Sequence, residues 1–225
     1  MRCILLSEKQ RHLALYQCLK IKFDSIEWIH IDKLLDFTEE NLKVLRPDYI
    51  FIPHWSHIIP EAITDNFQCV IFHMTDLPYG RGGSPLQNLI VRGHENTQVS
   101  ALRASKGMDT GPIYLKHPLS LEGTAEEIFE RCTWVIQDMI GEIIQDQLSP
   151  NEQIGEVVNF KRRKPEDGNI YELDSEIKIF NHIRMLDAID YPKAFIETKE
   201  FVLEFTQAKL DQNNKLSAHV HFIKK

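Results

Sequence analysis

The sequence lacks the features that mark metal-binding, secreted and membrane proteins. Its four cysteines, Cys3, Cys18, Cys69 and Cys132, have no metal-ligand spacing and each lies in an apolar stretch. We therefore expect buried free thiols in a reducing compartment and no metal site. There is no run of about 18 uncharged apolar residues, and the N-terminus has no apolar core with a small-residue cleavage site. These absences predict a cytoplasmic protein without a membrane partner.

Basic charge is also scarce. Lys and Arg number 26 against 33 Asp and Glu, which gives a formal net charge of −7 and a pI near 5.8. A large nucleic-acid footprint requires a basic face, so the balance predicts that nucleic acid, tRNA included, is an unlikely partner. A local basic patch is left open, as is a homodimer.

No glycine-rich phosphate loop follows the first apolar run, where residues 7–10 read S-E-K-Q. The chain nevertheless alternates strand-length apolar runs with stretches of helical period, which is typical of β-α units and a parallel sheet. We predict an α/β, Rossmann-like, mostly parallel sheet that binds no NAD. The expected strands are 3–6, 26–31, 49–52 and 70–72, with a further pair at 99–103 and 113–115; the expected helices are 10–20 and 32–44.

The C-terminal part predicts a small α+β subdomain. Thr124 and Glu127 form a T-x-x-E capping box before a long amphipathic helix. Turn-forming residues accumulate over 149–153, so we divide the chain into a catalytic domain, 1–150, and a C-terminal subdomain, 151–225. In the subdomain we expect a short helix around Ile183, and a β-hairpin of strands 201–205 and 216–222 joined by a turn at 211–214.

Two short segments, 73–85 and 106–113, each set a titratable side chain at the end of an apolar run and beside glycines. His73 directly follows an expected strand, and ligands of open α/β sheets bind outside the carboxyl ends of the strands. An imidazole serves as acid or base near neutral pH, and a carboxylate such as Asp109 holds its orientation. We expect a catalytic pair; the alternative is a buried hydrogen-bonded pair without chemistry.

The segments H-M-T-D-L-P-Y-G-R-G-G-S-P and K-G-M-D-T-G-P-I resemble the folate-dependent formyltransferase family. The resemblance runs over residues 47–116, and more weakly over 162–167 and 183–195. Within the family, the sequence looks most similar to sugar N-formyltransferases of the pseudaminic-acid type. This implies 10-formyltetrahydrofolate as the N10-formyl donor, no metal, and as acceptor the amine of a nucleotide-linked deoxyamino sugar, for which UDP-4-amino-4,6-dideoxy-N-acetylaltrosamine is the candidate. The alternatives are a methionyl-tRNA formyltransferase-like enzyme and a non-catalytic folate- or sugar-binding relative.

The resemblance also implies roles for individual residues. His73 would be the acid–base group and oxyanion partner, and Asp109 would orient it. The expected cofactor-binding residues are Trp55, Lys106, Gly107 and Met108, and the expected substrate-binding residues are Arg81, Gly82, Gly83, Ser84, Arg162 and Arg163. Ser84 is also expected to cap a helix that begins at Pro85. Trp55 could instead be a half-buried aromatic, Arg81 a plain loop residue, and the 162–164 cluster merely solvated.

One position departs from the family pattern. The family carries an asparagine two residues before the histidine, and Ile71 stands there. In acyl transfer, loss of an oxyanion donor costs roughly 2.7 to 4 kcal/mol. We expect another donor to replace the amide, with a backbone N–H of residues 80–84, His54, Ser56 and His57 as the candidates.

Overall fold

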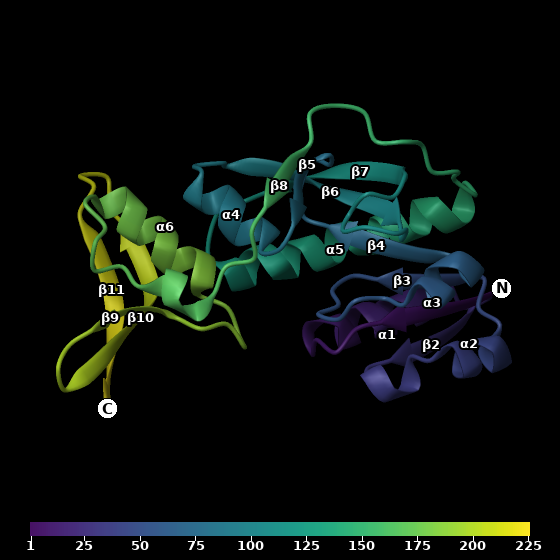
Figure 1. The fold of residues 1–225 in the computed structure, drawn as a ribbon, viewed down its shortest axis with the longest axis horizontal. Helices are drawn as coiled ribbons and strands as arrows, with labels where there is room; N and C mark the ends of the chain where they lie inside the picture. Colours follow the sequence, from purple (N-terminus) through teal and green to yellow (C-terminus); the bar gives the residue numbers. More distant parts are fainter. The chain divides into compact units, whose positions relative to one another are not determined.

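A six-stranded, mostly parallel sheet forms the main layer of the first of two compact units (Figure 1). The computed structural model describes residues 1–225. The strand order is β2-β1-β3-β4-β6-β7, with parallel pairing from β2 through β4 and antiparallel pairing of β6 with β4. The strands are β1 (Arg2–Leu6), β2 (Glu27–Ile31), β3 (Tyr49–Ile52), β4 (Cys69–His73), β6 (Asn96–Arg103) and β7 (Ile113–Ser120). The predicted α/β architecture is confirmed.

The central strands are buried on both faces, as expected for a parallel sheet covered by helices. Cys3, Ile4, Leu5 and Leu6 of β1 are all fully buried. This is why the strands appear in the sequence as continuous apolar runs rather than as alternating patterns. The thiols of Cys3, Cys69 and Cys132 are buried as expected, and burial raises the pKa of each to about 12.

The helices of this unit are α1 (Arg11–Lys22), α2 (Glu39–Leu45), α3 (Glu61–Asn66) and most of α5 (Ala125–Gln145), with a 3-10 turn η1 (Leu34–Asp36). The capping box of α5 forms: the Thr124 N–H donates to Glu127 Oε2 at 2.7 Å, and the Glu127 N–H donates to Thr124 Oγ1 at 3.3 Å. The single helix predicted over 32–44 is wrong, because Thr38 Oγ1 accepts the Asn41 N–H at 3.2 Å and starts a new helix there.

The second compact unit combines Gly83–Thr97, Ser120–Phe129 and Phe160–Lys225. It contains α4 (Pro85–Val91), η2 (Pro165–Gly168), α6 (Glu176–Leu186) and a three-stranded sheet, β11-β10-β9, made of β9 (Ala194–Glu197), β10 (Phe201–Leu210) and β11 (Leu216–Lys224). The predicted helix and hairpin are both present. The Gln87 amide donates to the Met185 carbonyl at 3.2 Å, so this packing joins earlier segments to the tail. The division into 1–150 and 151–225 stays a prediction.

Buried polar groups shape the loop that follows β4. The Ser100 hydroxyl, on β6, donates to the Thr75 carbonyl at 2.7 Å and accepts the Leu77 N–H at 3.3 Å. Both Thr75 and Ser100 are fully buried. The loop then enters β5 (Tyr79–Gly82), which pairs with β8 (Val158–Phe160) in a two-stranded sheet. None of the helices combines the length and apolar character needed to cross a membrane.

Candidate active site

His73 is the last residue of β4, and its side chain is only 8% exposed. The ring nitrogen Nε2 lies 2.8 Å from the Gly80 carbonyl oxygen. A carbonyl only accepts hydrogen bonds, so Nε2 carries a proton and donates it. The Thr75 hydroxyl donates to the same carbonyl at 3.3 Å, which fixes this turn further. The second ring nitrogen, Nδ1, is therefore the atom at which protonation of the ring changes.

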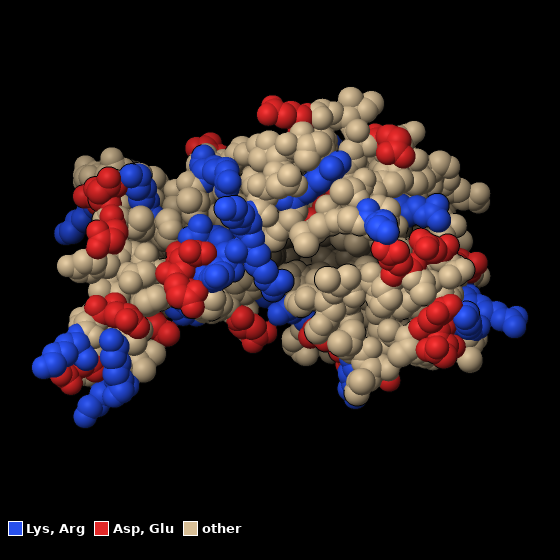
Figure 2. All heavy atoms as spheres, viewed as in Figure 1, with Lys and Arg blue, Asp and Glu red and all other residues tan.

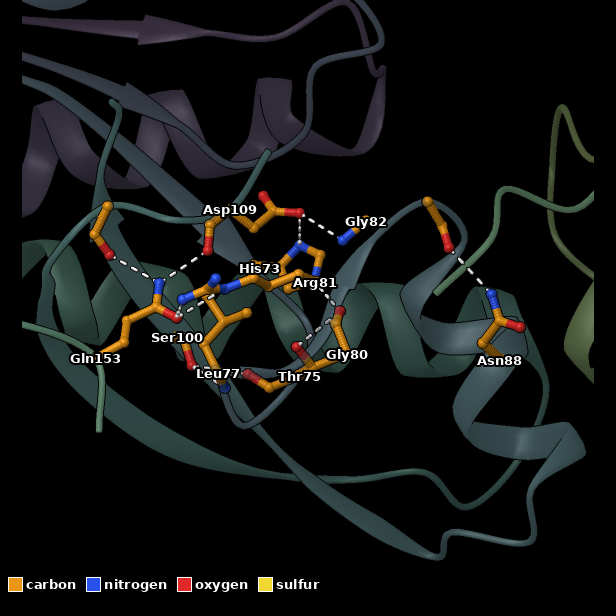
Figure 3. Close-up of polar contacts among 12 residues, drawn as sticks. His73, Thr75, Leu77, Gly80, Arg81, Gly82, Asn88, Ser100, Asp109 and Gln153 are labelled. Atoms are coloured by element: carbon orange, nitrogen blue, oxygen red, sulfur yellow. Dashed lines mark hydrogen bonds and ion pairs between the residues drawn. The ribbon is translucent and has the colours of Figure 1, made fainter. Parts of the chain in front are cut away.

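Asp109 faces that second nitrogen (Figure 3). Its Oδ2 lies 3.5 Å from His73 Nδ1 and accepts the Gly82 N–H at 2.9 Å. The Asp109 side chain is 11% exposed, and its backbone is left-handed, with φ 54°. A proton on Nδ1 faces a carboxylate in a sheltered place, and the charge attraction stabilises the imidazolium. The structure thus brings His73 and Asp109 together in an arrangement that can give or take one proton.

Gln153, which lies in the predicted boundary of turn-forming residues, contacts the residues of this site although no role was predicted for it. The Gln153 amide nitrogen donates to the carbonyls of Asp109 and Gly111, both at 2.8 Å. Its oxygen accepts from Arg81 Nε at 3.1 Å and from Nη2 at 2.7 Å. No local pattern signals this role, because the contacts join segments 42 to 72 residues apart.

The expected substrate residues fall in both compact units. In the first, Arg81 binds Gln153 and the Gly82 N–H binds Asp109. In the second, a Cβ on Gly83 would lie 2.5 Å from Arg162 Cβ, so only glycine permits this close approach. The ligand roles of these residues stay a prediction.

The expected capping of α4 by Ser84 is wrong in its geometry. Pro85 does occupy the first turn of α4, as predicted, but Ser84 has a left-handed backbone, with φ 51°, and its side chain makes no capping hydrogen bond. Its Oγ instead accepts the Arg163 N–H at 3.0 Å. Ser84 therefore links the start of α4 to the basic segment of the same unit.

The expected cofactor-binding residues lie in two places. Trp55 packs edge-on against Phe37, with ring centroids 5.9 Å apart, and its buried Nε1 has no hydrogen-bond partner. In the turn that precedes Asp109, the Lys106 carbonyl accepts the Thr110 hydroxyl at 2.9 Å. The same turn contains Gly107, with φ 97°, and Met108, which is 65% exposed. Their role in binding the formyl donor stays a prediction.

Ile71 lies on the same face of β4 as His73, because side chains alternate along a strand. It pairs with Ile52 of β3 and Leu102 of β6 and packs against the apolar cluster that contains Ile63. The Gly82 N–H, one of the expected substitute donors, is already bound to Asp109. The Gly82 N–H is therefore not free to replace the missing asparagine amide as an oxyanion donor.

We expect Ile71→Asn to destabilise the protein by roughly 1 to 3 kcal/mol without raising turnover, because the new amide would enter an apolar environment. Unfolding in urea and kcat, measured in parallel, test this. Ile71→Val is the matched control, with a cost of roughly 0.5 to 1.5 kcal/mol. A tenfold or larger rise in kcat for Ile71→Asn would show that the missing amide merely weakened the site.

Basic side chains are concentrated in one segment despite the acidic net charge. Lys161, Arg162, Arg163 and Lys164 are consecutive in the second unit, and Figure 2 shows Lys and Arg gathered over the segment that follows β8. Burial and the neighbouring Arg92 lower the pKa of Arg163, against the attraction of Asp167. The Arg163 Nη2 donates to the Asp167 carbonyl at 2.7 Å.

Comparisons with known proteins agree with this fold. A family model described as "Formyl transferase" matches residues 32–137, and one described as "Methionyl-tRNA formyltransferase, C-terminal domain" matches residues 165–223. A solved methionyl-tRNA formyltransferase from Clostridium thermocellum is 44% identical, covers 100% of both chains and superimposes with a TM-score of 0.96. A methionyl-tRNA formyltransferase from Thermodesulfovibrio yellowstonii is 31% identical over 153 residues, which are 64% of this chain and 50% of the relative.

The fold and the matching family model are those of a one-carbon transferase. The chain belongs to the formyltransferase family. It spans between 50% and 62% of the length of the curated relatives that it matches first.

The expectation of a nucleotide-linked sugar as acceptor is wrong. A sugar N-formyltransferase from a Shewanella species is only 14% identical, with a TM-score of 0.68, and shares the fold alone. The expectation that nucleic acid is an unlikely partner is contradicted by the same close relatives, which are methionyl-tRNA formyltransferases. A net charge sums over the whole surface and does not show local clusters of basic residues such as Lys161 to Lys164.

Proposed function

We propose that the chain transfers a formyl group from 10-formyltetrahydrofolate to the α-amine of methionyl-tRNA. The observation that carries this proposal is the 44% identity, over the full length of both chains, to the Clostridium thermocellum methionyl-tRNA formyltransferase. Two relatives from different bacteria agree in name, at 31% and 29% identity.

The residues present fit a folate donor. Trp55 offers an indole face beside the apolar cluster and a buried Nε1–H that still lacks an acceptor. The turn from Lys106 to Asp109 offers a glycine at φ 97° and an exposed methionine. We assign Trp55, Lys106, Gly107 and Met108 to hold the donor. When bound, it supplies the carbonyl carbon that the amine attacks.

His73 and Asp109 provide the proton chemistry. Nε2 is occupied by the Gly80 carbonyl, so the proton that the amine nitrogen loses as it bonds to the formyl carbon is held at Nδ1. Asp109 Oδ2, 3.5 Å away, stabilises the resulting imidazolium. The Gly82 N–H keeps the carboxylate in place during this change. The same Nδ1 proton is then available for the departing nitrogen, as general acid–base catalysis requires.

The basic segment from Lys161 to Lys164 supports an RNA substrate. Two of its residues, Arg162 and Arg163, were expected to bind substrate, and the phosphates of an RNA backbone are ligands that guanidinium groups prefer. Arg163 N–H binds Ser84 Oγ, so the segment is anchored to the start of α4 within the second unit.

Incubation of the purified chain with 10-formyltetrahydrofolate and a panel of acceptors tests the proposal. The panel contains methionyl-tRNA, uncharged tRNA, free methionine and a UDP-linked 4-amino sugar, and mass spectrometry identifies the formylated product. We expect N-formylmethionyl-tRNA and no other product, with turnover that falls as salt rises because phosphate contacts are screened. Formylation of the sugar without formylation of methionyl-tRNA would overturn the proposal.

A further inference from the structure

We propose that Gln153 is a positioning residue of this site: its amide holds Asp109 against His73 and holds Arg81 beside them. The inference rests on the proposed formyl transfer for its kinetic test. All four residues belong to the first compact unit, and Figure 3 shows the Gln153 side chain between the Asp109 turn and the Arg81 guanidinium.

Gln153 uses its full hydrogen-bonding capacity. Both amide hydrogens go to carbonyls, those of Asp109 and Gly111, and both lone pairs of Oε1 accept from Arg81. The reverse orientation would place the NH2 group against a guanidinium, which only donates, and the oxygen against two carbonyls, which only accept. The contacts therefore select a single orientation of the amide.

The turn that contains Asp109 is tightly packed, so a hydrogen bond to its backbone affects the position of the Asp109 carboxylate. A Cβ on Gly111 would lie 1.8 Å from the Arg103 carbonyl oxygen, so the chain passes β6 at a distance that only glycine permits. Asp109 itself has a left-handed backbone, which is costly for a residue other than glycine unless its surroundings hold it. A donor on the Asp109 carbonyl is such a support, and it sets where the carboxylate points.

The segment that carries Gln153 is itself anchored on both sides. Asn151 and Ile113 exchange backbone hydrogen bonds of 2.7 and 2.8 Å, and the Val158 N–H donates to the Pro78 carbonyl at 3.3 Å. Gln153 thus lies between an anchor on β7 and an anchor on the loop that leads to Gly80. Its amide acts from a fixed backbone rather than from a free loop.

Gln153→Leu and Gln153→Glu distinguish the hydrogen bonds that Gln153 accepts from Arg81 from those that it donates to the Asp109 and Gly111 carbonyls. Leucine removes both, whereas glutamate keeps an acceptor for Arg81 but sets a carboxylate oxygen against the Asp109 and Gly111 carbonyls. We expect both variants to lower kcat at least about tenfold, with KM for donor and methionyl-tRNA changed by less than about threefold. Gln145→Leu, the same change at an exposed position on α5, should match the parent. A Gln153→Glu variant with parental kcat would show that the hydrogen bond from Gln153 to the Asp109 carbonyl does not support turnover.

The ring nitrogens of His73 give a readout that does not depend on turnover. In ¹⁵N-correlated spectra of histidine side chains, we expect the His73 signals to shift in both Gln153 variants while the remaining histidines keep theirs. Unchanged His73 signals would overturn the proposal even if kcat fell. If the parent itself formylates no acceptor, the proposed function fails, and these spectra still decide whether Gln153 positions the pair.

Discussion

Replacing His73 with alanine is expected to lower kcat for formyl transfer by about a thousandfold, in the middle of the range for loss of an acid–base group. Asp109→Asn is expected to have a similar effect, because a neutral amide lacks the negative charge that attracts a protonated imidazole. The two residues act on one proton, so the double variant should be little worse than either single variant. Steady-state kinetics with saturating methionyl-tRNA measure these losses.

The folded state must survive both changes for this result to be informative. Asparagine tolerates the left-handed backbone at position 109, and Asp109→Asn keeps an oxygen for the Gly82 N–H. His219→Ala, an exposed histidine on β11, serves as the control and should retain parental kcat. Rates within tenfold of the parent in both single variants would show that the pair is a structural hydrogen bond without a catalytic role.

Acid is expected to destabilise the fold through His12, a buried histidine on α1. Burial, helped by the nearby charges of His54 and Arg11, lowers its pKa from 6.5 to about 3. The Ser7 Oγ lies 2.6 Å from His12 Nδ1 and accepts the Lys9 N–H at 3.1 Å, so the ring is enclosed by protein rather than by water. The native state therefore requires a neutral ring.

The sign of the pH dependence follows from this requirement. Between pH 6.5 and about 3, His12 is protonated in the unfolded chain but not in the native state. The free energy of unfolding therefore falls as the pH falls. By pH 5 the loss is roughly 2 kcal/mol relative to pH 7, at 1.36 kcal/mol per pH unit.

Urea unfolding at pH 7 and at pH 5 measures this loss. His12→Gln should remove about 2 kcal/mol of the pH dependence, whereas His219→Gln, at an exposed position, should leave it unchanged. The background from carboxylates is common to all three proteins and cancels. Equal pH dependence in parent and His12→Gln would refute the role of His12.

The sheet and the proximity of His73 and Asp109 were predictable because their signals are local. The strand at Tyr49–Ile52 was predicted with its observed bounds, since buried strands appear as apolar runs with turn residues beside them. His73 follows such a run at the carboxyl end of β4, where ligands of open α/β sheets bind, whereas Asp109 lies in the loop after the antiparallel strand β6 and was found from the glycines beside it. The capping box at Thr124 is local too, and it forms as expected.

The features that the sequence did not predict are of two kinds. Some depend on contacts between residues far apart in the chain, and one, the acceptor, depends on telling apart members of the same family. Gln153 acquires its role only where the chain returns to a turn 44 residues earlier. Ser84 was expected to cap its own helix, but the Arg163 N–H, 79 residues away, is its partner. The acceptor was misassigned because the motifs at 73–85 and 106–113 are shared across the family and do not separate its sugar-modifying from its tRNA-modifying members, while the acidic net charge counted against tRNA.

The discontinuous make-up of the second compact unit has a consequence for synthesis on the ribosome. The Gln87 amide and the Glu126 N–H bind the carbonyls of Met185 and Asp187, which are made roughly 60 to 100 residues later. At about 5 to 20 residues per second, these segments wait several seconds for their partners. During this time the nascent chain exposes apolar side chains of α4 that are buried in the folded protein, those of Leu86, Leu89 and Ile90. Nascent chains stalled before Met185 should therefore bind holdase chaperones. Nascent chains that extend beyond α6 can bury these side chains and should no longer bind the chaperones.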